Sequence, residues 1–452
     1  MHFEITKEFI DNLTRIINER DETAAIDVMN GLHAADIAEL YDEIDPGQAR
    51  FLFLLLDTEK AADVLAELED DDREKFLISI PSDVIARQFI EEMDSDDAAD
   101  VLADLPHEKK EEVLSHIEDL EQAGDIVDLL NYDEDTAGGL MAKELVSVHE
   151  DWTVEESINE VRKMAKDVDE IYFLYVIDKD EKLKGILSIK DLVINPMKSK
   201  ICDICSPDVK RAYTHDPAEG VANAMHKYDL VSMPVVDSIG RLAGRITIDD
   251  VVDFIREEAD KDYQMASGIS EDVESTDTVW ILSRARLPWL LIGMVGGVIG
   301  SLVIGYYEGD IMRYAGLALF LPMIAAMAGN VGVQSSAIVV QGLANKTLGK
   351  ESIPQKLLKE LFVGIFNGLI CSILVFIYNL FTADSFALTI TVSCALITVI
   401  IFASVFGTFV PLMLNRFNID PAVATGPFIT TANDIMGLFI YLFLGRFIFS
   451  FF

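Results

Sequence analysis

The sequence predicts a multidomain membrane protein with an all-α, solenoid-like N-terminal domain, an α/β tandem pair, a connecting helix and a five-helix transmembrane domain. Three observations lead to this prediction. Acidic and apolar residues are segregated along the 452-residue chain, two kinds of internal repeat occupy its first half, and five long apolar stretches occupy its second half.

Nearly all of the net charge lies in the first part of the chain. Of 36 Lys+Arg and 77 Asp+Glu, residues 277–452 hold nine basic and eight acidic residues, which leaves 27 basic and 69 acidic residues before them. That first part has a net charge of −42 and residues 277–452 have +1, which gives the total of −41. A surface this acidic repels nucleic acid and concentrates cations. We therefore expect cations, and no nucleic acid, as partners.

Residues 1–140 have apolar residues at helical spacing and repeat one phrase, which reads AADVLAEL from Ala61, AADVLADL from Ala98 and, more loosely, HAADIAEL from His33. Pro46, Pro81 and Pro106 fall between the copies, as helix breakers do. The pattern predicts stacked short helices.

Residues 141–253 alternate short β-branched runs with helical ones, and two passages match at an offset of 59 residues. FLYVIDKDEKLKGILSIKDLV is followed by SMPVVDSIGRLAGRITIDDVV, which places Asp178 opposite Asp237 and Gly185 opposite Gly244. Each copy has the order strand, turn, strand, helix, which indicates a duplicated α/β module.

Residues 254–283 form a charged stretch without strand signals or a continuous apolar face, FIREEADKDYQMASGISEDVE. A helix that is polar on most sides bridges domains or is held by partners. We predict a connecting helix here.

Residues 284–452 contain five apolar stretches long enough to span a bilayer, which needs about 20 residues. They are residues 287–306, 314–343, 358–380, 388–414 and 422–449. Basic residues flank mainly one side, which by the positive-inside rule puts the N-terminus in the cytoplasm and the C-terminus outside.

Four scattered cysteines give no disulfide framework, in keeping with a reducing compartment for the acidic part.

Three polar side chains in the spans are the strongest functional signals. Asn330 and Gln334 lie one helical turn apart in a segment rich in Gly, Ala and Ser, where they either pair between helices or line a pore. Asp434 lies near the middle of the fifth stretch, where an ionised carboxylate costs roughly 2.5–3.5 kcal/mol. The span interiors contain no Lys or Arg to pair with it. A passing cation is the favoured partner, and one carboxylate beside amides suits a largely hydrated Mg²⁺.

The Gly426–Pro427 break, with Pro322 in the second span, frees backbone carbonyls that can line a cavity at membrane depth. Ala424 and Pro427 bound the stretch that would present them. A plain helix kink remains the alternative.

These residues resemble the MgtE Mg²⁺ channels over essentially the whole chain. The resemblance rests on DTAGGLM from Asp135, the paired cystathionine-synthase-like (CBS) modules at Ile171 and Val231, the AGN-x-G-x-Q run at Ala328, and PFITTANDIMGL from Pro427. Ala328 is a departure, because the family often has Gly at that position.

The resemblance implies a homodimeric channel in the bacterial inner membrane, with a plug helix between the CBS pair and the pore. It implies that Asp434 selects the ion, with Asn330 and Gln334 lining the pore. It also implies that regulatory Mg²⁺ holds the gate shut by bridging carboxylates of the helical domain, the CBS pair and the plug. The expected ligands are Asp63, Asp96, Asp100, Glu219, Asp229, Asp250, Glu258 and Asp262.

CBS modules commonly bind adenine nucleotides through a Ser or Thr and an Asp three residues later. Here these are Ser188 with Asp191 and Thr247 with Asp250. Both pairs also suit helix N-caps, which gives them a purely structural alternative. The CBS resemblance implies ATP as a modulator of the pair.

Three other functions compete with a Mg²⁺ channel: a nucleotide-sensing membrane receptor, a coupled carrier, and a transporter for Mn²⁺, Co²⁺, Ni²⁺ or Ca²⁺. A receptor would not need Asp434, and a carrier typically shows an inverted repeat, which five spans do not display. The chain has no hydrolase cluster or Walker loop, so we do not expect an enzyme. The sequence does not rank the divalent ions.

Overall fold

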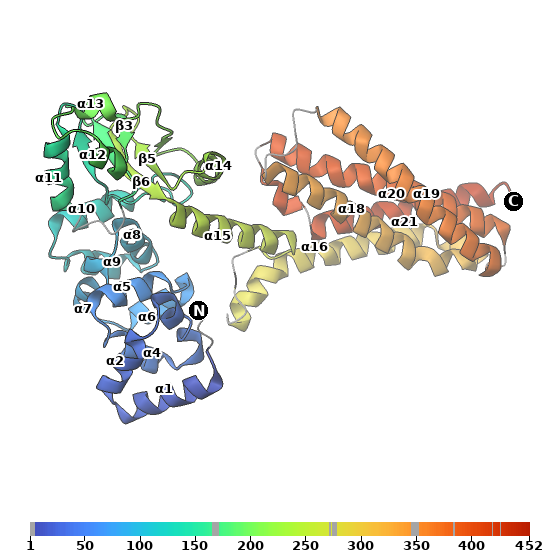
Figure 1. Ribbon diagram of the computed structural model, residues 1–452. Coiled ribbons are helices and arrows are strands. Elements are labelled where there is room, and N and C mark those ends of the chain that lie inside the picture. Colours follow the sequence, from blue (N-terminus) through green and yellow to red (C-terminus); the bar gives the residue numbers. More distant parts are fainter. Residues whose placement is uncertain are drawn as a thin grey trace. The chain divides into compact units, whose positions relative to one another are not determined.

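The structure is a computed structural model that describes residues 5–164, 171–270, 273, 278–344, 352–382, 385–417, 419–424 and 426–452; the side chains of residues 42, 71, 423 and 424 lie outside the description. The chain forms two compact units, Met1–Ile255 and Arg256–Phe452 (Figure 1). Each unit has a hydrophobic core of its own.

Stacked short helices form the N-terminal part of the first unit, which confirms the predicted all-α solenoid-like fold. Pro46 is the first residue of one helix, while Pro81 and Pro106 are the N-caps of two others, so the prolines separate helices as expected. The helices are α1 (Lys7–Glu19), α2 (Glu22–Asn30), α3 (Ala34–Ala38), α4 (Pro46–Phe53), α5 (Thr58–Ala66), α6 (Asp70–Ile78), α7 (Ser82–Gln88), α8 (Ser95–Ala103), α9 (His107–Leu114) and α10 (Leu120–Leu129), with the 3-10 turns η1 (Tyr41–Glu43) and η2 (Ile90–Glu92).

The repeated phrase is the buried face of equivalent helices. In α5 and α8 the Ala-Ala-x-Val-Leu residues point inward and are almost completely buried. Lysines close the gaps between repeats: the Lys60 ammonium donates to the carbonyls of Met29 and Leu32 at 2.8 and 2.7 Å. Lys109 likewise donates to two carbonyls at and just beyond the end of α6. These bonds satisfy carbonyls that a helix end leaves unpaired.

The α/β part contains two three-stranded sheets of identical topology, which confirms the duplication. In each sheet the first strand pairs parallel with the second, and the second pairs antiparallel with the third. The strands are β1 (Ser147–His149), β2 (Leu174–Ile177), β3 (Leu183–Leu187), β4 (Ala212–Tyr213), β5 (Ser232–Val236) and β6 (Leu242–Thr247). The helices are α11 (Val154–Met164), α12 (Ile189–Ile194), α13 (Ile201–Ile204), α14 (Ala218–Tyr228) and α15 (Ile248–Ala266).

The segment 137–142, which we call the seam, attaches the helical domain to the second CBS-like module. Its backbone N–H groups at Ala137 and Gly138 donate to the carbonyls of Asp216 and Thr214 at 2.8 and 2.9 Å. Ala142 exchanges two backbone hydrogen bonds with Arg245 of β6, at 2.8 and 2.9 Å. The helical domain is therefore joined to β6 by backbone pairing.

The connecting helix differs from its predicted extent of 254–283. α15 begins at Ile248, so the helix of the second module and the connecting helix are one element. It ends at Ala266, and Gly268 then takes a φ of +81°, a left-handed conformation that ends helices. Ser270 donates backbone and hydroxyl hydrogen bonds to the carbonyl of Ala285, at 3.1 and 2.8 Å. The next helix starts at Val279, capped by Thr278.

Among the described residues of the second unit, five helices are long and apolar enough to cross a membrane, as predicted. The first starts eight residues before its predicted start, because Thr278 caps it and Pro288 is accommodated inside it. The spans are α16 (Val279–Tyr306), η3 (Ala315–Phe320) with α18 (Leu321–Ala344), α19 (Ile353–Thr382), α20 (Phe386–Arg416) and α21 (Pro427–Phe449), with α17 (Glu308–Arg313) and η4 (Pro421–Ala424) between spans.

Glycines bring the membrane helices into close contact. A Cβ on Gly332 of α18 would overlap the Asn433 side chain of α21, and one on Gly407 of α20 would overlap the Gly332 carbonyl. A Cβ on Gly296 of α16 would overlap Thr431. Small residues thus permit the tight helix crossings expected in a bilayer.

The seam generates a prediction about stability. A Cβ on Gly244 of β6 would lie 2.6 Å from the Ala142 carbonyl oxygen, so Gly244→Ala should destabilise the first unit by about 1–3 kcal/mol. Gly220→Ala, in the open interior of α14, should instead be neutral or stabilising by up to ~1 kcal/mol. Urea unfolding of the full-length variants, monitored by hydrogen exchange of the β6 amides, measures both effects. A Gly244→Ala protein as stable as the Gly220→Ala protein would contradict the close packing of the seam.

Candidate cation sites

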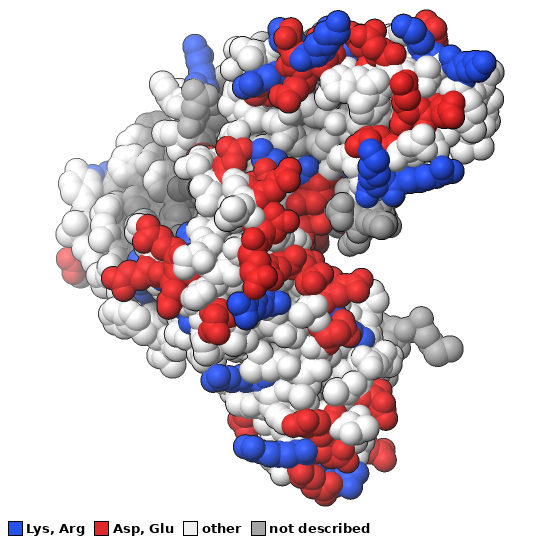
Figure 2. Space-filling view, turned by 90° about the vertical axis from the view of Figure 1, so that its left-hand side faces the viewer, with Lys and Arg blue, Asp and Glu red and all other residues white. Residues whose placement is uncertain are grey.

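Acidic side chains gather where the helical domain meets the second CBS-like module. Figure 2 shows them collected in the hollow between these two parts of the first unit. The hollow contains a cavity of about 360 Å³. Its acidic lining residues, the acidic pocket, are Asp63, Glu92, Asp94, Asp96, Asp97, Asp249 and Asp250.

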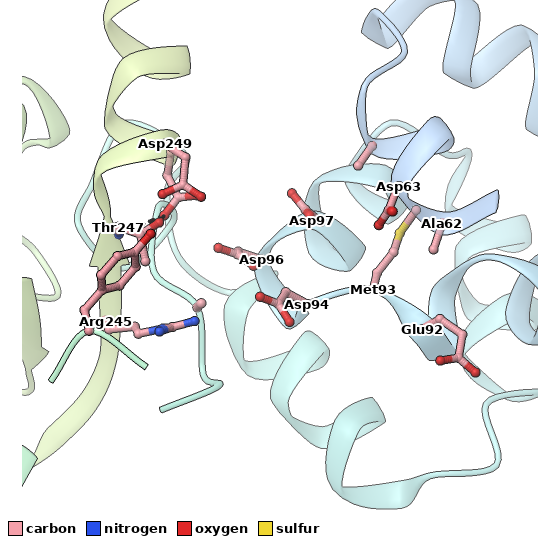
Figure 3. Close-up of a pocket in the computed structure, with 14 residues that line it drawn as sticks. Ala62, Asp63, Glu92, Met93, Asp94, Asp96, Asp97, Arg245, Thr247 and Asp249 are labelled. Atoms are coloured by element: carbon pink, nitrogen blue, oxygen red, sulfur yellow. Dashed lines mark hydrogen bonds between the residues drawn. The ribbon is translucent and has the colours of Figure 1, made fainter. Parts of the chain in front are cut away.

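Two helix starts place most of these carboxylates. Asp96 and Asp97 belong to the first turn of α8, and Asp249 and Asp250 to the first turn of α15. The first turn of a helix carries partial positive charge and favours acidic residues there. Figure 3 shows the α8 carboxylates directed across the cavity toward α15, with Asp63 behind them on α5. Residues far apart in sequence therefore share one cavity.

Three acidic oxygens form a tight group beside this pocket, whose lining includes Asp94 and Asp96 but not Glu144. One carboxylate oxygen each of Asp94, Asp96 and Glu144 lies within 4.8 Å of the others. Ser95 holds Glu144 in place, since its N–H and Oγ donate to the two oxygens of Glu144 at 3.1 and 2.8 Å. The Oδ1 atom of Asp96 is buried and has no hydrogen-bond partner among the described residues. Hard divalent cations prefer such oxygen ligands.

Burial and the charges of neighbouring acids raise the pKa values of Asp96, Asp97 and Asp100. Burial, followed by the charges of Asp250 and Asp97, raises the pKa of Asp96 well above its usual range. Burial and then Asp250 raise the pKa of Asp97 to about 6. Burial raises that of Asp100 to about 7, although the Arg73 guanidinium opposes the shift. A bound cation would relieve the same repulsion that these protons relieve.

The structure brings some predicted regulatory ligands together and separates others. Asp63, Asp96 and Asp250 line the acidic pocket, whereas Asp100 lies one turn farther along α8. Glu219 and Asp229 lie at the two ends of α14, outside the pocket lining.

The two predicted ligands on the connecting helix, Glu258 and Asp262, lie one turn apart on the part of α15 that belongs to the second unit. Glu258 pairs with Lys261 at 3.3 Å.

The predicted nucleotide residues make similar contacts in the two modules. Asp191 accepts from the Ser188 N–H and Oγ at 3.3 and 2.6 Å, and Ser188 is the N-cap of α12. Asp250 accepts from the Thr247 N–H and Oγ1 at 2.9 and 2.6 Å. Thr247 and Asp250 also line the acidic pocket. The structural alternative of a helix cap is thus present at Ser188, and the carboxylate contacts are the same in the second copy.

The membrane unit places Asp434 beside α18. A Cβ on Gly329 would lie 2.9 Å from Asp434 Oδ1, which is buried and has no hydrogen-bond partner among the described residues. Asn330 and Gln334 are exposed on the surface of the single chain. Because α21 starts at Pro427, Asp434 lies seven residues, or about 10 Å, from the start of its helix rather than near the middle.

The start of α21 contacts the end of the connecting helix. Pro427 is the first residue of α21, and a Cβ on Gly268 would lie 2.5 Å from its Cγ. A Cβ on Gly426 would overlap the carbonyl oxygen of Ala266. Ala424 ends the turn η4, and its side chain lies outside the described residues. Pro322 is the second residue of α18 and follows the 3-10 turns of η3, so the predicted break is present there.

Sequence reasoning missed Asp94, Glu144 and Arg73. Asp94 precedes the second copy of the repeated phrase, as Asp57 precedes the first, and this N-cap spacing was a usable signal. Arg73 is buried and bonds Asp104 at 3.0 and 2.7 Å and Asp70 at 2.6 Å. No sequence pattern places Glu144 near α8, because the seam brings it there.

Family comparisons agree with this arrangement. The family model MgtE, described as a divalent cation transporter, matches residues 321–444. The model of the MgtE intracellular N domain matches 32–135, and the CBS domain model matches 137–197 and 201–257. The magnesium transporter MgtE of Thermus thermophilus is 33% identical over 439 residues, 96% of this chain and 97% of that protein. The MgtE of Bacillus subtilis is 33% identical over 313 residues, 69% of each chain.

Two solved structures resemble the first unit. The soluble part of a magnesium transporter matches with a TM-score of 0.51 and 29% identity, over 56% of this chain and 99% of that one. The cytosolic domain of the Mg²⁺ channel MgtE in complex with ATP matches with a TM-score of 0.51 and 34% identity, over 54% and 99%.

The spans, the intramembrane carboxylate and the family matches define a class, the multi-pass membrane transporters that act on divalent cations. The relatives that match over two thirds of the chain or more are named magnesium transporters. The chain belongs to the MgtE family of magnesium transporters.

The raised pKa values generate a pH prediction. Between about pH 4 and pH 7 the folded state binds more protons than the unfolded state at Asp97 and Asp100, so stability should fall as pH rises through this window. Hydrogen exchange of α8 amides in the Mg²⁺-free full-length protein, corrected for intrinsic exchange rates, measures this trend. Asp100→Asn should flatten it, whereas Glu22→Gln, an exposed acid of α2, should not. Protection that is constant from pH 5 to 7 would contradict the raised pKa values.

Proposed function

We propose that this protein is a Mg²⁺-selective channel that mediates magnesium uptake and is shut by Mg²⁺ bound at its acidic sites. The observation that carries the proposal is Asp434, an intramembrane carboxylate whose buried Oδ1 has no partner among the described residues. Uncompensated charge at membrane depth typically marks an ion pathway.

The pathway residues fit a hydrated ion. Mg²⁺ gives up its water reluctantly and is bound through one or two carboxylates while it keeps several waters. Asp434 supplies such a carboxylate, and the Asn330 and Gln334 amides can hydrogen bond to the retained water.

A homodimer would complete this pathway. Asn330 and Gln334 are exposed in the single chain although they lie within a membrane span. Amides facing lipid would be unsatisfied, so a second copy facing this side of α18 would bury them and bring two Asp434 carboxylates to one axis.

The proposed closing signal is Mg²⁺ in the acidic pocket, with Glu258 and Asp262 of the connecting helix as further ligands. A cation favours whichever state binds it better. Carboxylates from α5, α8 and α15 share the pocket only while the helical domain and the second module stay together. The end of α15 contacts Gly426 and Pro427, seven residues before Asp434, which gives the signal a physical route to the pore helix.

ATP is proposed as a modulator at the CBS pair. The support is a related cytosolic domain solved in complex with ATP and the Thr247–Asp250 pair at the pocket edge. The Ser188–Asp191 pair is the equivalent in the first module.

The proposed orientation has the first unit in the cytoplasm and the C-terminus outside the bacterial inner membrane. Arg284, Arg286, Lys356, Lys359 and Arg416 then flank the cytoplasmic side, in keeping with the positive-inside rule.

Replacing Asp434 tests the pathway. Asp434→Asn keeps side-chain size and removes the charge, so Mg²⁺ flux into proteoliposomes should fall at least tenfold, the equivalent of about 1.4 kcal/mol, while the protein still assembles. Phe443→Leu, an exposed position on the same helix, is the matched control. Wild-type flux in a folded Asp434→Asn protein would overturn the pathway assignment, and faster flux of Mn²⁺ or Ca²⁺ would overturn the ion assignment.

Replacing acids of the pocket tests closure. The double variant Asp96→Asn/Asp250→Asn removes two proposed ligands, so patch recordings should show half-maximal closure at a several-fold higher internal Mg²⁺ concentration. Open-channel conductance should stay unchanged because Asp434 is intact. Glu22→Gln controls for loss of surface charge. Closure at the wild-type concentration in the double variant would place the sensor elsewhere.

A further inference from the structure

Glu360 is a carboxylate near the start of the third span, α19, and the pathway proposed above does not use it. It lies seven residues into the 30-residue helix α19, about 10 Å from the helix start. It is half-buried, and its Oε1 accepts a hydrogen bond from Ser335 Oγ of α18 at 2.6 Å. Across the part of the chain that is described, it makes no ion pair.

This contact is short and partly buried, and it joins two different spans, α18 and α19. A hydrogen bond in such a place restrains the helices that carry its two partners, because it requires a particular distance and angle.

Ser335 is adjacent to the proposed pore amide Gln334 on α18. At Gly329 and Gly332, α18 packs closely against α21 and α20, and these contacts require the glycine face of α18 to point toward those helices. The hydrogen bond from Ser335 to Glu360 adds a second restraint on rotation, because a hydrogen bond weakens steeply away from its preferred angle.

Rotation of α18 determines what faces the pathway. Successive helix residues are about 100° apart, so Ser335 points about 140° away from Asn330 and about 100° away from Gln334. Ser335 is buried while both amides are exposed, in agreement with this geometry. Turning α18 enough to break the Ser335–Glu360 bond would turn both amides as well.

We propose that Glu360 is a positioning residue which, through its hydrogen bond to Ser335, fixes the rotation of α18 so that Asn330 and Gln334 face the ion pathway. The inference rests on the proposed function, since it takes these two amides as pathway residues. It assigns no direct contact between Glu360 and the transported ion.

A double-mutant cycle in the full-length protein tests this role, with the preference for Mg²⁺ over Ca²⁺ in proteoliposome flux as the readout. Glu360→Ala and Ser335→Ala should each lower that preference about five- to tenfold, the worth of a hydrogen bond, and the double variant should be no worse than either. Glu360→Gln, whose amide oxygen still accepts from Ser335, should stay within about twofold of wild type. Phe362→Leu, an exposed α19 residue, is the control.

The outcomes separate the two proposals. Additive losses in the double variant, or a Glu360→Gln protein as impaired as Glu360→Ala, would overturn the positioning role, the latter because charge rather than hydrogen bonding would then matter. Wild-type preference in both alanine variants would also overturn it. The proposed pathway itself fails only if Asp434→Asn conducts normally, a measurement independent of the cycle.

Discussion

Mutual repulsion among the carboxylates of the acidic pocket is the interaction on which the behaviour of the first unit depends. Folding forces α8 and the start of α15 to share one cavity, so it concentrates like charge that the unfolded chain keeps apart. Protons and the buried Arg73 relieve this repulsion, and a bound cation would relieve it too. Such a cation would compete with protons for the same carboxylates.

The membrane unit holds polar side chains in a medium that does not solvate them. Glycines let α18, α20 and α21 approach until the backbone itself is in contact. That proximity places Asp434 against α18 instead of lipid. The same close packing leaves little space in which α21 could move alone.

Much of this arrangement could be predicted from the sequence, because its signals are local or periodic. The spans follow from apolar length, the module duplication from matched Asp and Gly positions, and Asp434 from a lone charge in an apolar run. The group formed by Asp94, Asp96 and Glu144 could not be predicted, since only the seam brings Glu144 beside α8. The continuity of α15 was also missed: the turn after Thr247 and the charged stretch after Asp253 belong to one helix, but their compositions differ.

The seam has a mechanical consequence. Because residues 137–142 are joined by backbone hydrogen bonds to Asp216, Thr214 and β6, any movement of the helical domain relative to the second module would be a rotation about the seam. Points near a hinge travel least and points far from it travel most. Glu144 lies two residues beyond the seam, and Ser95 binds the start of α8 to it. The group formed by Asp94, Asp96 and Glu144 would therefore move little in such a rotation. Asp63, on α5, lies farther from the seam, so it would move farther in such a rotation and leave the cavity first.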